Sequence, residues 1–281
     1  MKKKQIIAVI VTVVVLIIGY ISYEFFTYVK TDNAQIMAST VMMAPKVSGY
    51  VIKADLNEGQ HAKAGDVLIE LDDRDYQNSL KQLKGEAEGL KAQLRDAESN
   101  FGRIQKLYKS EAVSQQQYDQ VFANVSSVRA RNEAISAQVA QAELNISNTK
   151  LRAPVDGVVA RKSVEVGQLA SPGVPLVGFV SSAERWVMAN FKETDLDSIR
   201  IGAKVDVEVD AIGDRAFHGT VESLSSATGA TFALLPPDNA TGNFTKVVQR
   251  VSARIKLLDL TPADIERLRA GLSAVVKVHK H

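Results

Sequence analysis

The fold is decided by two stretches of sequence that repeat with a constant offset of 108 residues, 49-GYVIKADLNEGQHAKAGDVLIEL-71 and 157-GVVARKSVEVGQLASPGVPLVGF-179. Each stretch alternates apolar and polar residues around two glycine-containing turns, a pattern typical of short strands with one buried face. Neither half is long enough to close a core alone, so we expect the two halves to pair into one β-sandwich. Seven positions coincide without a gap, which argues against a chance match of two turns: Gly49/Gly157, Val51/Val159, Gly59/Gly167, Gln60/Gln168, Ala62/Ala170, Gly65/Gly173 and Leu68/Leu176.

Between these halves, over residues 73–150, the apolar period changes from two to seven. Apolar residues then step by four and three without a break, which predicts two coiled-coil helices. Asn132 is the only strongly polar residue on either seam. The first seam is Tyr76, Leu80, Leu83, Ala87, Leu90, Leu94, Ala97, Phe101, Ile104 and Tyr108, and the second is Tyr118, Val121, Val125, Val128, Asn132, Ile135, Val139, Ala142 and Ile146.

The six residues 109–114 that join the two seams are too few for anything but an antiparallel return, so we expect a helical hairpin. A pair of helices packed on a globular body is the alternative, but the narrow seam with polar flanks favours a free-standing rod. Asp72, Asp73 and Asp75 resemble a cation or catalytic cluster. We interpret them instead as the acidic first turn of the first helix, where negative charge favours the helix dipole.

The remainder of the chain, residues 181–281, shows short alternating strands with glycine-containing turns, which predicts a small antiparallel β-barrel. Residues 225–245 are rich in Gly, Ala, Thr and Pro, and we interpret them as a long loop. Thr261 followed by Pro262 predicts the N-cap and first turn of a short helix.

The N-terminus begins with Lys2, Lys3 and Lys4, followed by 19 uncharged residues from Gln5 to Tyr23. A helix of this length spans about 28 Å, the thickness of a bilayer core. The run is longer than the apolar region of a cleaved signal peptide and ends in aromatic residues, which favours an uncleaved anchor over residues 1–26. The three lysines are expected to stay in the cytoplasm, which places the bulk of the chain outside it.

The composition excludes several classes of function. The 281 residues carry a formal net charge of only +2, which excludes a broad basic face for nucleic acid. The absence of cysteine excludes disulfides, thiolate metal sites and a cysteine nucleophile, and only four histidines are present. No phosphate-binding loop, HExxH, GxSxG or dinucleotide fingerprint occurs, so we expect no catalysis, no cofactor and no metal.

An anchor, a split sandwich, an inserted helical hairpin and a following barrel together resemble the HlyD family of periplasmic membrane fusion proteins. Residues 31-TDNA-34 and 44-APKVSGYV-51 look like the start of the first half of that family's biotinyl-lipoyl-like domain, and 151-LRAPVDG-157 looks like the start of the second. Residues 234-LLPPDNATGNF-244 and 246-KVVQRV-251 are similar to those of Emr-type multidrug efflux adaptors. The resemblance implies a fold that is mainly β, with the lipoyl-like domain at 40–72 and 151–180.

The hairpin tip is similar to that of adaptors that dock on a TolC-like outer-membrane channel. The pattern is an Arg, a Leu four residues on and a Ser seven beyond, here Arg103, Leu107 and Ser114. Arg can bind carbonyls or carboxylates in a fork, Leu can fill a groove, and Ser can donate a hydrogen bond. The alternative is that Leu107 only closes the coil and Ser114 only caps the second helix. Emr-type adaptors usually have a longer hairpin, so the pump assignment depends mainly on the loop.

The resemblance implies a periplasmic adaptor of a tripartite efflux pump, anchored in the inner membrane by a single pass. Its expected partners are an inner-membrane transporter of the major-facilitator type, a TolC-like channel and further copies of itself, as a trimer or hexamer. The loop residues Phe232, Leu234, Leu235 and Phe244 are expected to face the pump or the ring lumen, because they are apolar in a polar loop. Three alternatives remain: an adaptor of an ABC-type exporter of peptide or protein, a membrane-tethered hydrolase, and a structural tether without transport.

Overall fold

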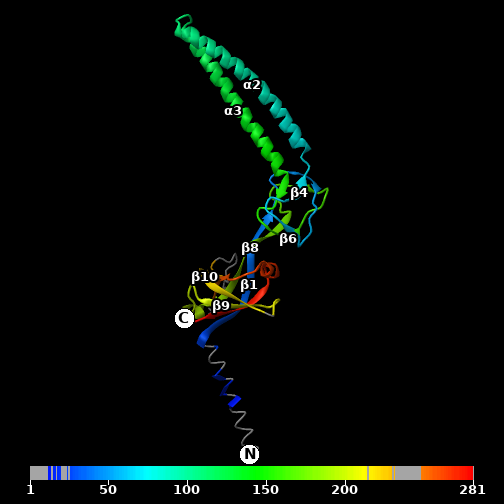
Figure 1. The fold of residues 1–281 in the computed structure, drawn as a ribbon, viewed down its shortest axis with the longest axis vertical. Helices are drawn as coiled ribbons and strands as arrows, with labels where there is room; N and C mark the ends of the chain where they lie inside the picture. The colour runs from blue at the N-terminus through cyan, green and yellow to red at the C-terminus, as the bar shows by residue number, and fades with distance from the viewer. Residues whose placement is uncertain are drawn as a thin grey trace, which may run out of the picture. The chain divides into compact units, whose positions relative to one another are not determined.

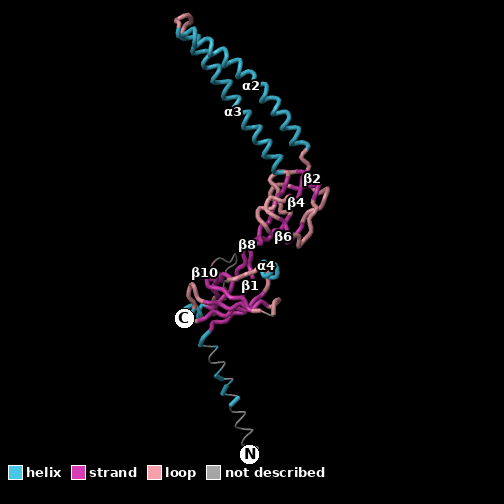
Figure 2. The backbone as a smooth tube through the Cα atoms, in the orientation of Figure 1, coloured by secondary structure: helices cyan, strands magenta, loops and turns pink. Residues whose placement is uncertain are grey.

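The computed structural model describes residues 26–213, 215–229, 231 and 248–280, together with residues 12, 13, 15, 16, 18, 19 and 24. The chain divides into two compact units, one of residues 40–180 and one of residues 1–39 and 181–281. The prediction of a mainly β fold with an inserted helical hairpin is confirmed (Figures 1 and 2). Most of the predicted membrane anchor lies outside the described residues, and among those that are described no helix is both long and apolar enough to cross a membrane.

In the unit 40–180, strands of one repeat pair with strands of the other, in addition to the pairing of β2 with β4 within the first repeat. Strand β2 (Gly49–Lys53) pairs with β7 (Leu169–Ala170), and β3 (His61–Ala62) pairs with β6 (Gly157–Lys162). Strand β4 (Val67–Leu71) lies between β2 and β5 (Lys150–Arg152), which completes the order β5-β4-β2-β7. The expected pairing of the two halves is therefore confirmed.

The backbone of the two repeats is equivalent down to single hydrogen bonds. The Gly59 amide donates to the Val159 carbonyl at 2.8 Å, and the Gly167 amide donates to the Val51 carbonyl at 2.8 Å. Both glycines have a left-handed backbone, with φ of 85° and 86°, and the second pair of turns repeats this at Gly65 and Gly173. The two halves of the repeat thus make equivalent hydrogen bonds to each other, and together they enclose one apolar core. That core includes Val51, Ile69, Leu71, Val159, Leu176, Val177 and Phe179.

The hairpin consists of α2 (Arg74–Lys109) and α3 (Gln115–Asn148), which lie side by side along their length (Figure 1). Apart from Tyr108, which is exposed, the predicted seam residues are buried or half-buried, and Ala97, Val125, Ile135 and Ala142 are buried. Two ion pairs join the helices in one register: Lys84 to Glu143 and Arg129 to Glu98, both at 2.8 Å. Both pairs are exposed, so they help to fix the register while apolar packing supplies most of the stability.

The interpretation of the acidic cluster is corrected in part. Asp73 is the N-cap of α2 and makes no side-chain capping bond, and only Asp75 lies in the first turn. The Asp72 carboxylate accepts hydrogen bonds from the Arg74 side chain, at 2.9 Å from Nε, and from its backbone amide. These bonds lower the pKa of Asp72 to about 2. A carboxylate so firmly ionised is not suited to proton transfer near neutral pH.

In the other unit, the described residues form a barrel of six strands, in the order β1-β12-β9-β10-β11-β8, which β1 closes by also pairing with β8. The strands are β1 (Tyr28–Met43), β8 (Val177–Lys192), β9 (Lys204–Val209), β10 (Ala216–Thr228), β11 (Arg250–Leu257) and β12 (Ser273–His279). Strands β1 and β8 continue from one unit into the other. The buried faces form one apolar core that includes Ile36, Val187, Phe191, Val207, Ile255 and Val276.

Two features of this barrel differ from the sequence prediction. Strand β1 was not predicted, and it brings residues 28–39 into a barrel that we expected to begin at 181. The predicted loop 225–245 begins too early, because β10 continues to Thr228 and pairs there with Val251 of β11. Residues 232–247 lie outside the described part of the chain.

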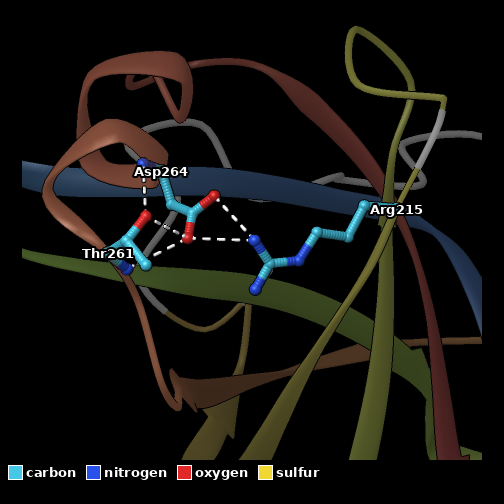
Figure 3. A network of polar contacts seen from close by, with 3 residues as sticks. All are labelled: Arg215, Thr261 and Asp264. Carbon is cyan, nitrogen blue, oxygen red and sulfur yellow. Dashed lines mark hydrogen bonds and ion pairs between the residues drawn. The ribbon is translucent and has the colours of Figure 1, made fainter.

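The short helix α4 (Pro262–Arg267) begins at Thr261 as predicted, and a buried carboxylate holds its start. Figure 3 shows the Asp264 carboxylate between Thr261 and the guanidinium of Arg215. Asp264 accepts from the Thr261 hydroxyl at 2.7 Å, from the Thr261 amide at 3.0 Å and from Arg215 Nη1 at 2.9 Å. These hydrogen bonds, chiefly those from Thr261, lower the pKa of Asp264. The network ties α4 to the start of β10, and we assign it a structural role.

Candidate docking site at the hairpin tip

The turn at the hairpin tip is organised by the backbone of Leu107. Its carbonyl accepts from the Ser110 hydroxyl at 3.0 Å and from the Ala112 amide at 2.9 Å. Glu111 takes a left-handed backbone, with φ of 58°, which lets the chain reverse within a few residues. These bonds satisfy the Leu107 carbonyl, which the end of α2 would otherwise leave free. The backbone of Leu107 is thus held in place, while the residue remains 43% exposed.

Arg103 and Ser114 reach the same end of the hairpin from different helices. Arg103 is exposed and lies off the seam, and its Nη2 is 3.5 Å from Asn100 Oδ1. Ser114 is the N-cap of α3, and its hydroxyl oxygen accepts from the Gln117 amide at 3.3 Å. The capping bond uses the oxygen as an acceptor, so the hydroxyl proton is still free to donate. The structure gives no direct contact among the three predicted docking residues, all of which are exposed.

An aromatic cluster that the sequence analysis missed lies directly below the turn. The ring of Tyr118 stacks on that of Tyr108, with centroids 4.8 Å apart, and lies 5.6 Å from the ring of Phe101. Phe122 extends the cluster, with its ring centroid 5.7 Å from that of Phe101, although the residue lies off the seam and is 52% exposed. Contacts of this kind contribute roughly 0.5–1.5 kcal/mol per pair beyond area burial. The cluster is therefore expected to stiffen the last turns of the rod beneath the exposed residues.

The charges around the tip are arranged asymmetrically. Lys106 and Lys109 lie in the last turn of α2, where they favour the negative end of the helix dipole, and Arg103 lies one turn further back. Glu111 is the acidic residue of the turn, and the first turn of α3 carries none. The end of the rod thus presents three cations and an exposed leucine, an arrangement that can bind an acidic or carbonyl-lined groove.

Two kinds of site remain besides the tip: metal sites, and the residues predicted to act in the anchor and the loop. In the described parts of the chain, no group of His, Asp and Glu side chains has the geometry to hold a metal ion. The other predicted functional residues are Lys2, Lys3 and Lys4 of the anchor and Phe232, Leu234, Leu235 and Phe244 of the loop. All seven lie outside the described residues, so their roles stay predictions.

Comparison with known proteins identifies the family. Residues 39–180 match the family described as "RND MFP, barrel-sandwich hybrid domain". The chain is 33% identical to the multidrug export protein EmrA of Haemophilus influenzae, over 99% of this chain and 84% of that protein. It is 32% identical to the colistin resistance protein EmrA of Acinetobacter baumannii, over 99% of this chain and 95% of that protein.

A solved structure gives the same fold. The crystal structure of a MacA–MexA chimeric protein, which contains the Pseudomonas aeruginosa MexA α-hairpin domain, matches with a TM-score of 0.64 at 22% identity. The match covers 91% of this chain and 82% of that one. The chain therefore belongs to the membrane fusion proteins and, within them, to the Emr type. Its relatives are adaptor proteins rather than enzymes.

Proposed function

We propose that this chain is the periplasmic adaptor of a tripartite efflux pump, which couples an inner-membrane transporter of the major-facilitator type to a TolC-like outer-membrane channel. The observation that carries the proposal is the similarity to the multidrug export protein EmrA over 99% of the chain. Such similarity over all domains, rather than over one, supports a shared role for the whole molecule. The exported compounds are proposed to be drugs, as the names of that relative and of the colistin resistance protein suggest.

The hairpin tip is proposed to bind the channel. The backbone of Leu107 is held by hydrogen bonds, whereas the residue is exposed to solvent. Arg103 lies one turn before Leu107 on the same helix. A rigid rod that ends in an exposed apolar residue and a fork of donors is suited to a groove with carbonyl or carboxylate groups. The stacked rings beneath the turn support this role, because a preorganised tip loses less entropy on binding.

The N-terminal run of uncharged residues is proposed to anchor the chain in the inner membrane by a single pass. The lysines at its start would remain in the cytoplasm, and both described units would lie in the periplasm. Several copies are proposed to assemble around one pump, as a trimer or hexamer. The apolar loop residues 232–244 are proposed to contact the pump or to line the ring.

Cross-linking in living cells tests the proposal most directly. Affinity-tagged full-length chain is cross-linked, purified under denaturing conditions, and its partners are identified by mass spectrometry. We expect one major-facilitator transporter and one outer-membrane channel, and we expect deletion of the gene to raise drug sensitivity. Recovery of an ABC transporter instead would replace the proposed pump with the alternative exporter. Recovery of neither partner, with unchanged drug sensitivity, would contradict the adaptor role.

A further inference from the structure

A pocket of about 290 Å³ lies at one end of the barrel, where β1 begins, β8 ends and β11 begins. Three cations line it, one from each of these strands: Lys30, Lys192 and Arg250. The pocket is completed by Thr31, Asp32 and Asp195. None of these residues belongs to the hairpin, so the pocket is independent of the docking tip.

The cations in this pocket repel one another when no ligand is bound. Lys192 and Arg250 are direct cross-strand partners on β8 and β11, and like charges in that position repel each other. Within the part of the chain that the structure describes, none of the three cations forms an ion pair. Two other cations of the barrel are matched with carboxylates: Arg254 with Glu222 at 2.6 Å and Lys277 with Glu208 at 2.9 Å.

The two carboxylates in the pocket do not neutralise it. Asp195 accepts a hydrogen bond from the Thr194 hydroxyl at 3.2 Å, and neither Asp195 nor Asp32 reaches any of the cations. Three cations thus face two carboxylates. The Thr31 hydroxyl donates to the Asn190 carbonyl at 2.8 Å, which holds β1 against β8, and Lys30 and Lys192 on these two strands line the same pocket. A cluster held in this way favours an anion that can contact several donors together.

The position of the pocket in the chain indicates where that anion comes from. Lys30 follows the end of the uncharged run, Tyr23, by only seven residues. Seven residues span at most about 25 Å when fully extended, so a membrane-anchored chain keeps this end of the barrel near the bilayer surface. The outer rim of a bilayer presents phosphodiester groups, whose oxygens accept from Arg in a fork and from Lys as a point charge.

We propose that this pocket binds the phosphodiester of an anionic phospholipid headgroup, and so seats the base of the barrel on the membrane. The proposal rests on the N-terminal anchor proposed above for the approach to the bilayer. The binding chemistry itself depends only on Lys30, Lys192 and Arg250. A headgroup phosphate would relieve the repulsion between Lys192 and Arg250, so binding is expected to stabilise the barrel.

Short-chain lipids test the proposal without a bilayer. Full-length protein in a neutral detergent is unfolded by heat at constant ionic strength, and the fluorescence of Trp186, the single tryptophan, reports on the barrel. Dihexanoyl-phosphatidylglycerol should raise the unfolding temperature, while dihexanoyl-phosphatidylcholine should raise it little. Arg250→Gln and, separately, Lys192→Gln should weaken the response to phosphatidylglycerol roughly tenfold, as expected for the loss of one charge-assisted hydrogen bond.

Lys256→Gln is the matched control, because Lys256 is an exposed cation on the same face of β11 at its other end. It should keep the full response.

Without lipid, the Arg250→Gln variant should unfold at the same temperature as the natural chain or at a higher one. If the role of Arg250 were purely structural, the variant would unfold at a lower temperature. An equal response to inorganic phosphate would assign the site to free phosphate and overturn the lipid assignment. The site itself would be overturned if phosphatidylglycerol did not raise the unfolding temperature of the natural chain. It would also be overturned if both pocket variants responded to phosphatidylglycerol as fully as the natural chain does. Neither result depends on drug efflux, so failure here is distinguishable from failure of the adaptor proposal.

Discussion

Arg103 and Lys91 are a matched pair of exposed cations on α2. Each lies off the seam and reaches back three residues, Arg103 to Asn100 and Lys91 to Glu88, both at 3.5 Å. Because neither packs in the core, Arg103→Asp should change the free energy of unfolding by no more than about 0.5 kcal/mol. The substitution removes a forked donor and adds repulsion toward carboxylates or carbonyls, so efflux should fall while expression and pump binding persist. Drug-resistance assays and thermal unfolding measure the two effects.

Lys91→Asp is the control for that experiment, since it reverses the same charge in the middle of the rod. We expect it to leave drug resistance unchanged. Equal loss of resistance in both variants would mean that charge on the rod matters in general, and the tip would lose its special role.

Asp264 offers a test at the scale of one buried side chain. Its pKa is lowered chiefly by the hydrogen bonds from Thr261, and further by Arg215. A lowered pKa in the folded state means that the carboxylate stabilises the barrel above the ordinary pKa of aspartate, and that this contribution is lost as the pH falls through the lowered value. Asp264→Asn should therefore lower the unfolding temperature at neutral pH, and its difference from the natural chain should shrink in acid.

Arg215→Gln separates the two sources of that effect. Its side chain is 47% exposed, so its ion pair with Asp264 should contribute less than the bonds from Thr261. We expect a smaller drop in unfolding temperature than for Asp264→Asn. A larger drop would show that the ion pair, rather than the hydrogen bonds from Thr261 to Asp264, holds α4.

At the scale of elements, prediction from sequence succeeded where the signal is local. The heptad seam repeats within each helix, and the capping residue Thr261 stands directly before its helix, so both could be read from neighbouring positions. Strand β1 was missed because its partners are distant: Tyr28 pairs with His279, and a bulge between Thr31 and Ala34 interrupts the alternation. The contact of Phe122 with Phe101 was missed for a similar reason, because it depends on the register between two helices. The aromatic residues at the tip end of the two seams could have suggested that rings stack there.

The start of α3 gives a test that separates capping from docking. Ser114→Ala removes the acceptor for the Gln117 amide and should cost about 1 kcal/mol at the helix start. Ser114→Asp restores a good N-cap but has no hydroxyl proton to donate. If Ser114 contacts the channel, the Asp variant should keep the Gln117 amide protected in hydrogen exchange and still lose efflux. Full efflux in the Asp variant would reduce Ser114 to a cap.

The segment between β10 and β11, which the sequence predicts to be a loop, is a second element whose role can be tested. Its residues Phe232, Leu234, Leu235 and Phe244 are apolar in a polar setting, and such groups commonly mark a partner surface. Deletion of residues 232–244 should lower co-purification of the pump and with it drug efflux. The unfolding transition of Trp186 serves as the control that the barrel still folds. If transport and co-purification are both unchanged, the loop is only a connection.

For the whole molecule, the proposed function depends on which side of the inner membrane the two units occupy. Positive residues next to an apolar segment bias that end toward the cytoplasm. Alkaline phosphatase fused after Thr31, which is active only in the periplasm, should therefore be active, and a reporter active only in the cytoplasm should be silent at the same position. Replacement of Lys2, Lys3 and Lys4 by Glu should lower the phosphatase activity and raise that of the cytoplasmic reporter. Cytoplasmic activity of the unaltered fusion would contradict the orientation, and the docking tip could then not reach an outer-membrane channel.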